Sequence, residues 1–203
     1  MLSHRRIKLT LVLAVIVASG VALLAWTQVW ATVRLAADGT TQQVLDVTGS
    51  IAAPGLTALA LAGLALAGAL TIAGVVIRFV LGLLEMLLGV SVILSAALAV
   101  FDPVGASAAA VTAATGIAGA DSTRAAVSGA ALTFWPFLAL AAGVLMFLIG
   151  LLVCLTAKRW PGPTKRYDAT TFEPVTDPAT GQTRPRDAVD DWDGLTRGDD
   201  PTA

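Results

Sequence analysis

Long apolar segments separated by polar stretches dominate the chain up to about residue 156. One runs from about residue 7 to 28 and another from about 133 to 155, and each is nearly free of charged residues. A helix needs about 20 apolar residues to cross roughly 30 Å of hydrocarbon. We therefore expect each of these two segments to form one transmembrane helix.

The apolar stretch between residues 56 and 100 is too long for one span. Arg78 interrupts it, and a single straight helix would place that guanidinium in the hydrocarbon at a cost of about 2.5–3.5 kcal/mol or more. Two spans at about 56–75 and 80–100, with Arg78 in the turn between them, avoid this cost. The pattern therefore predicts an all-α membrane protein, a four-transmembrane-helix bundle within residues 1–156.

Lysine and arginine gather on one side of such a bundle. They flank the first span, the predicted turn and the last span: Arg5, Arg6, Lys8, Arg78, Lys158, Arg159, Lys165 and Arg166. The other side has only Arg34 and Arg124, in longer loops. Because cytoplasmic loops carry an excess of Lys and Arg, we expect a multi-pass protein with both termini in the cytoplasm.

Two other assignments of the segments stay open. The first apolar run could be a cleaved signal peptide, because a basic leader precedes it and Val29-Trp30-Ala31 loosely fits a cleavage site. Its length and the crowding by Trp26 and Trp30 argue against cleavage. A fifth span could lie in 104–120, but its small residues are nearly neutral towards lipid, and a fifth span would place the last basic cluster outside.

The remaining stretches are predicted to be loops and a tail. The outer loops cover 31–54, which has short β-like runs at 31–35 and 43–47 and could form a small cap, and 101–132, a low-complexity stretch. Neither loop has the apolar content for a core of its own. Residues 157–203, rich in Pro, Asp and Arg, are expected to be a largely disordered cytosolic C-terminal tail.

Composition narrows the chemistry. Charged residues make up 13% of the 203 positions, against roughly 25% in a soluble domain. The chain has one cysteine, Cys154, and one histidine, His4, which cannot form an intrachain disulfide, a zinc site or a Ser–His–Asp triad. We expect no catalytic residues, no metal, no cofactor and no nucleic-acid partner, and a protein that is not an enzyme.

Glu85 is the one ionisable residue inside a predicted span. A carboxylate costs a few kcal/mol to place in the membrane and is therefore a functional candidate by default, for proton relay or for binding a cationic substrate. The alternative is a shallow side chain that pairs with Arg78, about 10 Å of helix rise away, or that is protonated.

Tryptophans mark the outer ends of two spans. Trp26 and Trp30 close the first span, and Trp135 opens the last on the same side. Because indole rings favour the headgroup level, one interpretation is an aromatic belt. The other is a stacking site for an aromatic ligand, which requires the first and last spans to be neighbours.

Small residues repeat every four positions along the predicted spans. The repeats are Ala65, Ala69 and Ala73, then Ser91, Ser95 and Ala99, and finally Ala139 with Gly143. Such stripes let helix backbones approach closely. The partner could be another span of the chain or a second copy in a homo-oligomer.

Three motifs stand out at the end of the first span and in the tail. They are Leu24-Ala25-Trp26-Thr27-Gln28-Val29-Trp30, then Arg159-Trp160-Pro161-Gly162 with Arg166-Tyr167-Asp168, and finally Asp191-Trp192-Asp193-Gly194-Leu195-Thr196-Arg197-Gly198-Asp199-Asp200-Pro201-Thr202. In this order around four spans, they resemble the Trp biosynthesis-associated membrane proteins of actinobacteria. The resemblance covers nearly the whole chain and implies the plasma membrane and a link to tryptophan synthesis. It implies no known activity and no site residue.

Two functions follow as expectations. The first is a non-catalytic membrane accessory protein whose tail docks a cytosolic tryptophan-pathway protein. The tail residues expected to dock are Trp160, Pro161, Gly162, Arg166, Tyr167, Asp168, Trp192, Leu195, Arg197, Gly198 and Pro201. The second is a small transporter of tryptophan, indole or a related aromatic metabolite, built on Glu85 and the outer tryptophans. A membrane enzyme is the weakest hypothesis, because the sequence has no nucleotide-binding glycine pattern and no paired histidines.

Overall fold

The computed structural model describes residues 2–36, 43–159, 175–176, 183–184 and 196. The chain divides into two compact units, Met1–Pro163 and Thr164–Ala203. In the second unit the described residues include two short antiparallel strands, β4 (Val175–Thr176) and β5 (Thr183–Arg184). The predicted disorder of the tail falls mainly on residues outside the described ranges.

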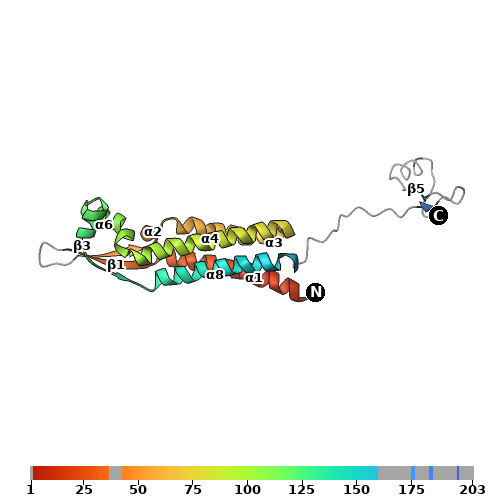
Figure 1. The fold of residues 1–203 in the computed structure, drawn as a ribbon, viewed down its shortest axis with the longest axis horizontal. Helices are drawn as coiled ribbons and strands as arrows, with labels where there is room; N and C mark the ends of the chain where they lie inside the picture. The colour runs from red at the N-terminus through yellow and green to blue at the C-terminus, as the bar shows by residue number, and fades with distance from the viewer. Residues whose placement is uncertain (1, 37–42, 160–174, 177–182, 185–195, 197–203) are drawn as a thin grey trace. The chain divides into compact units, whose positions relative to one another are not determined.

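Four apolar helices run side by side in the first unit (Figure 1). They are α1 (Leu2–Thr27), α3 (Leu56–Ile72), α4 (Val75–Phe101) and α8 (Trp135–Thr156). Helix α1 packs on α3 and α8, and α4 packs on α8 and α3. We call the end that holds the starts of α1 and α4 and the ends of α3 and α8 the basal end, and the opposite end the apical end.

Three of these helices are long and apolar enough to cross a bilayer: Arg6–Thr27 of α1, and the whole of α4 and α8. Helix α3 is equally apolar but has 17 residues, so it rises about 25 Å and is shorter than the usual span. Four long spans were predicted, and three of the four apolar helices have the length of a span.

The turn between α3 and α4 is shorter than predicted and does not contain Arg78. Helix α3 ends at Ile72, and α4 begins at Val75 after Gly74, whose backbone is extended. Arg78 lies one turn inside α4, where its side chain is 1% exposed. The prediction that Arg78 occupies the turn is wrong, because the helix break falls at Gly74, which has the weakest helix propensity after proline.

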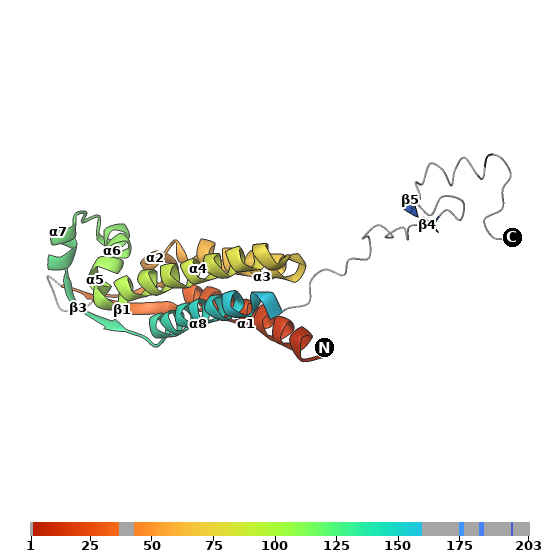
Figure 2. The same ribbon diagram turned by 45° about the vertical axis from the view of Figure 1, so that its right-hand side comes forward.

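The two predicted outer loops fold together at the apical end (Figure 2). They form a three-stranded sheet in the order β2-β1-β3, with β1 antiparallel to both neighbours. The strands are β1 (Val29–Leu35), β2 (Val44–Thr48) and β3 (Val127–Leu132), and the short helices are α2 (Gly49–Ala52), α5 (Pro103–Ala106), α6 (Ala108–Thr115) and α7 (Ala120–Ala125). We call these elements the apical cap. The predicted β-like runs are confirmed as β1 and β2. The chain is mostly helical, as predicted, but the three-stranded sheet means that the fold is not purely α.

The apical cap has a small core. Along β1, Ala31, Val33 and Leu35 are buried while Arg34 is exposed, the alternation expected of a strand with one covered face. Val47 of β2 and Ala110 and Val111 of α6 complete the cluster. Residues of both predicted loops make this core, because the two loops pool apolar residues that neither has in sufficient number alone, and this pooling was not predicted.

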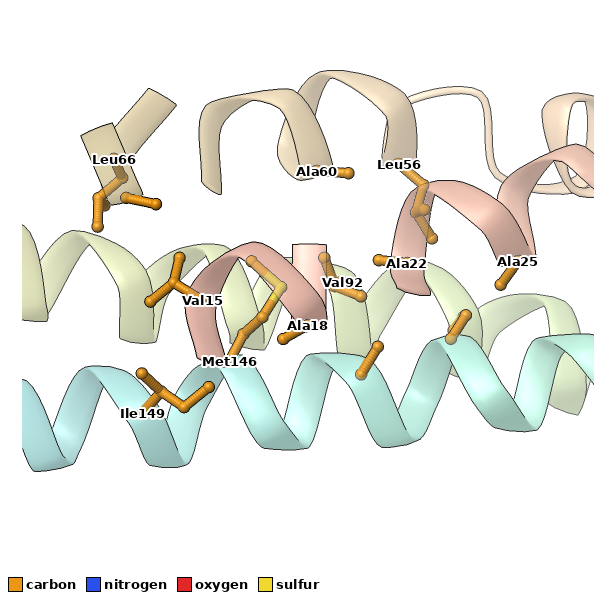
Figure 3. Close-up of a cluster of buried hydrophobic side chains, with 14 of the residues drawn as sticks. Val15, Ala18, Ala22, Ala25, Leu56, Ala60, Leu66, Val92, Met146 and Ile149 are labelled. Carbon is orange, nitrogen blue, oxygen red and sulfur yellow. The ribbon is translucent and has the colours of Figure 1, made fainter. Parts of the chain in front are cut away.

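The larger core lies between the four long helices, and Figure 3 shows its centre. Small and branched residues alternate there: Val15, Ala18 and Ala22 of α1 face Leu56, Ala60 and Leu66 of α3, Val92 of α4, and Met146 and Ile149 of α8. Because alanines occupy so many interior positions, the helix axes can lie close together.

Candidate functional site

The outward faces of the long helices are aliphatic. Large apolar side chains stay exposed along α1, α4 and α8, among them Leu13, Leu87, Leu94, Leu148 and Leu155. Soluble monomers rarely expose large continuous apolar surfaces, whereas hydrocarbon solvates such surfaces without cost. The interior, by contrast, holds the few polar groups that the helices carry.

Helices α4 and α8 make the closest contact in the bundle, through glycines spaced seven residues apart. A β-carbon added at Gly89 would lie 2.5 Å from the backbone nitrogen of Phe147, and one added at Gly150 would lie 2.7 Å from the carbonyl oxygen of Gly82. Gly143 meets the carbonyl oxygen of Gly89 in the same way. The two backbones therefore touch at these levels, which fixes the register of α4 against α8.

The predicted stripe of Ala139 and Gly143 lies on this contact, whereas the roles of Gly82, Gly89 and Gly150 were missed from the sequence. Of the predicted stripe in α3, Ala73 is buried and Ala65 is exposed, and the buried face of that helix carries Gly63, Leu66 and Ala67. The available signal was the seven-residue spacing of Gly82 and Gly89, and of Gly143 and Gly150.

Glu85 lies on the buried seam of α4, between the glycines that touch α8. The seam repeats with alternating steps of four and three residues: Arg78, Gly82, Glu85, Gly89, Val92, Ala96 and Ala99. Glu85 is 0% exposed, and neither of its carboxylate oxygens has a hydrogen-bond partner among the described residues. Its carboxyl group is therefore enclosed within the bundle.

Glu85 and Arg78 share the seam, and neither carboxylate oxygen of Glu85 accepts a hydrogen bond from a described residue. An unpaired charge in an apolar interior costs several kcal/mol, whereas a neutral carboxyl group costs much less. The surroundings of Glu85 therefore favour its neutral, protonated form.

Basic residues meet at the basal end of the bundle. Lys8 of α1 donates from Nζ to the carbonyl oxygen of Thr71 at 2.6 Å, and its charge also interacts with that of Arg78 on α4. The short helix η1 (Ala157–Arg159) extends α8 at the same end and adds the exposed Lys158. Sequence reasoning grouped these cations correctly on one side.

The three outer tryptophans pack against the core of the helix bundle, but they do not form an open stacking site. Helices α1 and α8 are neighbours, as that hypothesis required. Trp30 is 1% exposed, and its Nε1 donates to the carbonyl oxygen of Ala25 at 2.7 Å. Trp26 and Trp135 are half-buried against the same core.

Trp30 is held in place by Gly49 and leaves no face for a ligand. A β-carbon at Gly49 would lie 2.6 Å from Nε1 of Trp30. Trp30 thus closes the junction between α1 and the apical cap. Both sequence interpretations fail for this residue, because a buried indole reaches neither a headgroup nor a ligand.

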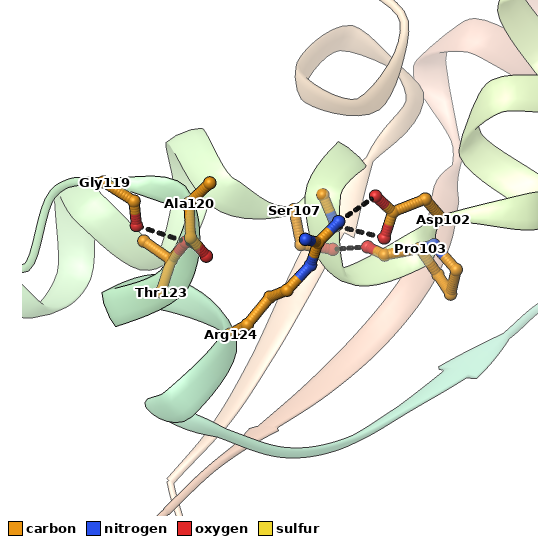
Figure 4. A network of polar contacts seen from close by, with 8 residues as sticks. Asp102, Pro103, Ser107, Gly119, Ala120, Thr123 and Arg124 are labelled. Carbon is orange, nitrogen blue, oxygen red and sulfur yellow. Dashed lines mark hydrogen bonds and ion pairs between the residues drawn. The ribbon is translucent and has the colours of Figure 1, made fainter.

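Polar contacts of the apical cap centre on Asp102 and Arg124 (Figure 4). Asp102 accepts from the backbone N–H of Gly105 at 2.9 Å and pairs with Nη2 of Arg124 at 2.7 Å. These two contacts hold the pKa of Asp102 below its ordinary value. Both side chains are about half exposed, and their ion pair joins α7 to the junction between α4 and α5.

The described residues contain no cluster of three or more metal-ligating side chains. Cys154 is half-buried on α8, next to Gly82 of α4. The tail residues expected to dock a partner lie outside the described residues. They are Trp160, Pro161, Gly162, Arg166, Tyr167, Asp168, Trp192, Leu195, Arg197, Gly198 and Pro201.

Spanning helices with aliphatic outer faces and a small-residue interior define an integral membrane protein. A family model described as tryptophan-associated transmembrane protein matches residues 12–202, and the chain belongs to that family. The resemblance seen in the sequence motifs is confirmed. No curated protein and no solved structure matches the chain.

Proposed function

We propose that the chain is a non-catalytic accessory protein of the plasma membrane that serves tryptophan biosynthesis and docks a cytosolic partner through its tail. The observation that carries this proposal is the arrangement of the basal end. Lys8, Arg78 and Lys158 gather there, and α8 ends there and leads into the tail. A basic bundle end favours the cytoplasmic side, where biosynthetic enzymes work.

The proposed topology has four passes. Helices α1 and α3 are antiparallel, because Lys8 meets Thr71 while Ser19 meets Gly63. Helices α4 and α8 are also antiparallel, because Gly82 meets Gly150 while Gly89 meets Gly143. The short α3 is then one of the four passes. An even number of passes supports cytoplasmic N- and C-termini and an external apical cap.

The glycine contacts support a rigid anchor. Backbones that touch at Gly89 and Gly150 cannot approach further and separate only by losing that packing. A fixed bundle suits a protein that holds a tail near the membrane. The tail motifs, rich in Trp, Gly and Pro, are the segments that we propose contact the partner.

Deletion of residues 190–202 from the full-length chain tests the docking proposal. Crosslinking in intact cells, followed by purification from membranes, should recover a tryptophan-pathway protein with wild type and lose it with the deletion. A matched control replaces the same residues with a Gly/Ser segment of equal length. Equal recovery from all three chains, with unchanged growth under tryptophan limitation, would reject docking.

A transporter of tryptophan, indole or a related aromatic metabolite remains the second candidate, because Glu85 is a fully buried ionisable group in the bundle. Vesicles with wild type or Glu85→Gln should then differ in flux of labelled tryptophan or indole. If vesicles with and without the protein show the same flux, this candidate fails and the accessory function is unaffected.

A further inference from the structure

Glu85 is the ionisable side chain of the bundle that the accessory function does not use. It is 0% exposed, and both oxygens lack a hydrogen-bond partner among the described residues. It lies three residues from Gly82 and four from Gly89, the positions where α4 touches α8. The carboxyl group is thus enclosed at the tightest helix contact of the molecule.

The groups that face Glu85 offer it little compensation for a negative charge. Its own helix carries Arg78, about 10 Å of rise towards the basal end. Helix α8 carries Cys154, whose thiol lies beside Gly82 and Phe79, and α3 has no titratable residue between Leu56 and Ile72. The cations Lys8 of α1 and Lys158 of η1 lie at the basal end.

A metal ion does not fit this position. Hard cations need about six oxygen ligands, and the described residues bring no second carboxylate or other metal-ligating cluster to Glu85. The backbone carbonyl groups of α4 and α8 are engaged within their helices. A proton is the cation that one carboxyl group can bind alone.

We propose that Glu85 is a proton-binding site inside the bundle, protonated in the packing seen here, and that loss of the proton loosens the contact between α4 and α8. On release, the O–H bond breaks, the electron pair stays on the carboxylate, and the proton passes to water that enters the loosened seam. The buried carboxylate then draws in water or the guanidinium of Arg78. The seam of α4 thereby responds to pH, whether or not the tail docks a partner.

The chain offers a direct measurement, because its sequence contains two glutamates, Glu85 and Glu173. Full-length protein with ¹³C-labelled glutamate carboxyl groups, in liposomes, should give two carboxyl resonances by solid-state NMR. Glu173→Gln removes the second resonance, and Glu85→Gln assigns the first.

At neutral pH, the Glu85 resonance should have the chemical shift of a protonated acid, while Glu173 reports an ordinary carboxylate. Raising the pH should convert the Glu85 signal to the carboxylate position. A carboxylate shift for Glu85 at neutral pH would overturn the proposal, as would a shift that follows sodium or potassium concentration at fixed pH. Loss of the Glu85→Gln protein to misfolding leaves the Glu173→Gln measurement intact.

Cys154 reports the second half of the proposal, because its side chain lies against Gly82 in the seam. A membrane-permeant maleimide should alkylate Cys154 several-fold faster in wild type than in Glu85→Gln at the high pH where Glu85 is ionised, and equally in both at the lower pH. Comparison at one pH cancels the ionisation of the thiol itself. Equal rates at both pH values would show that the seam does not open.

Discussion

Single residues decide how the cap joins the bundle. The indole ring of Trp30 is buried inside the protein. Its N–H donates a hydrogen bond to the carbonyl oxygen of Ala25, and the ring lies against Gly49. From the sequence alone, a tryptophan at the end of a span suggests a membrane interface. The burial of Trp30 could not be predicted, because Gly49 and the core of the bundle enclose it only in the folded chain.

Gly49→Ala should destabilise the junction between α1 and the apical cap. The added methyl group would lie 2.6 Å from Nε1 of Trp30 and 2.7 Å from the carbonyl oxygen of Trp26, and such overpacking costs about 1–3 kcal/mol. Unfolding in mixed micelles of rising SDS content measures the loss. Gly55→Ala is the matched control, because nothing lies within 4 Å of its added carbon. Equal stability of the two variants would contradict this reading.

The apical cap should lose stability in acid, because the contribution of the Asp102 carboxylate is lost when it is protonated. Its lowered pKa means that the folded state favours the carboxylate, so the stabilisation is complete above the ordinary pKa of about 3.9 and is lost as the pH falls below it. The effect is small, since both partners are half exposed.

The measurement for Asp102 is the Tm difference between wild type and Asp102→Asn. That difference should shrink as the pH falls from about 5 to about 2. Arg124→Gln should weaken the pH dependence without removing it, because Gly105 still donates to Asp102. A Tm difference independent of pH would show that Asp102 gains nothing from its contacts.

Secondary-structure elements divide into those with a local signal and those without one. Apolar length predicted the four helices, and alternation predicted β1 and β2. Strand β3 and helices α5–α7 were not predicted, because Ala, Gly, Ser and Thr carry little pattern. The pairing of β1 with β3 joins segments nearly a hundred residues apart, for example Val33 with Ala130. Local sequence patterns cannot predict a strand pairing over such a distance.

The sequence predicted part of the candidate site on the buried seam of α4. The sequence identified Glu85 as the ionisable residue of a span, but it assigned Arg78 to the turn between two spans. In the structure both side chains lie on the same buried face of α4. The reason is the exact alternation of four- and three-residue steps, which keeps one face of a helix turned towards its neighbour.

Gly89→Ala should separate α4 from α8. The new carbon would lie 2.5 Å from the Phe147 nitrogen and 2.8 Å from the Gly143 oxygen, atoms that cannot move as a flexible side chain would. We expect a loss of about 1–3 kcal/mol in the free energy of unfolding in SDS-containing micelles.

Gly68→Ala provides the control for this helix contact. Nothing lies within 4 Å of its added carbon, and alanine favours a helix over glycine by about 1 kcal/mol. It should therefore leave stability equal or raised. If Gly89→Ala behaved like Gly68→Ala, the helices would not touch at that level.

The whole molecule is held together at its apical end by a link between the first and last helices. Thr133, just before α8, donates from Oγ1 to the carbonyl oxygen of Val29 at 2.6 Å, and its N–H donates to that of Trp30 at 2.9 Å. The sheet thereby fixes where α1 ends and where α8 begins.

Thr133→Val should weaken this link while keeping the shape of the side chain. Loss of the Oγ1 hydrogen bond should cost about 1 kcal/mol, and amide hydrogen exchange in β1 and β3 should become faster while exchange in α3 stays unchanged. Thr133→Ser, which keeps the hydroxyl group, should behave as wild type. Faster exchange throughout the bundle would instead indicate global destabilisation.

The central position of β1 in the three-stranded sheet has a consequence for how the chain itself is synthesised and inserted. The ribosome makes Val29 long before its partner Thr133, 104 residues later, so β1 leaves the translocation machinery with one edge exposed. Strand β2 can pair with β1 early. The other edge of β1 stays unpaired until α3 and α4 have been inserted and β3 has been made. During that interval the unfinished sheet is the most aggregation-prone part of the nascent chain, and truncation before residue 127 would make the exposure permanent.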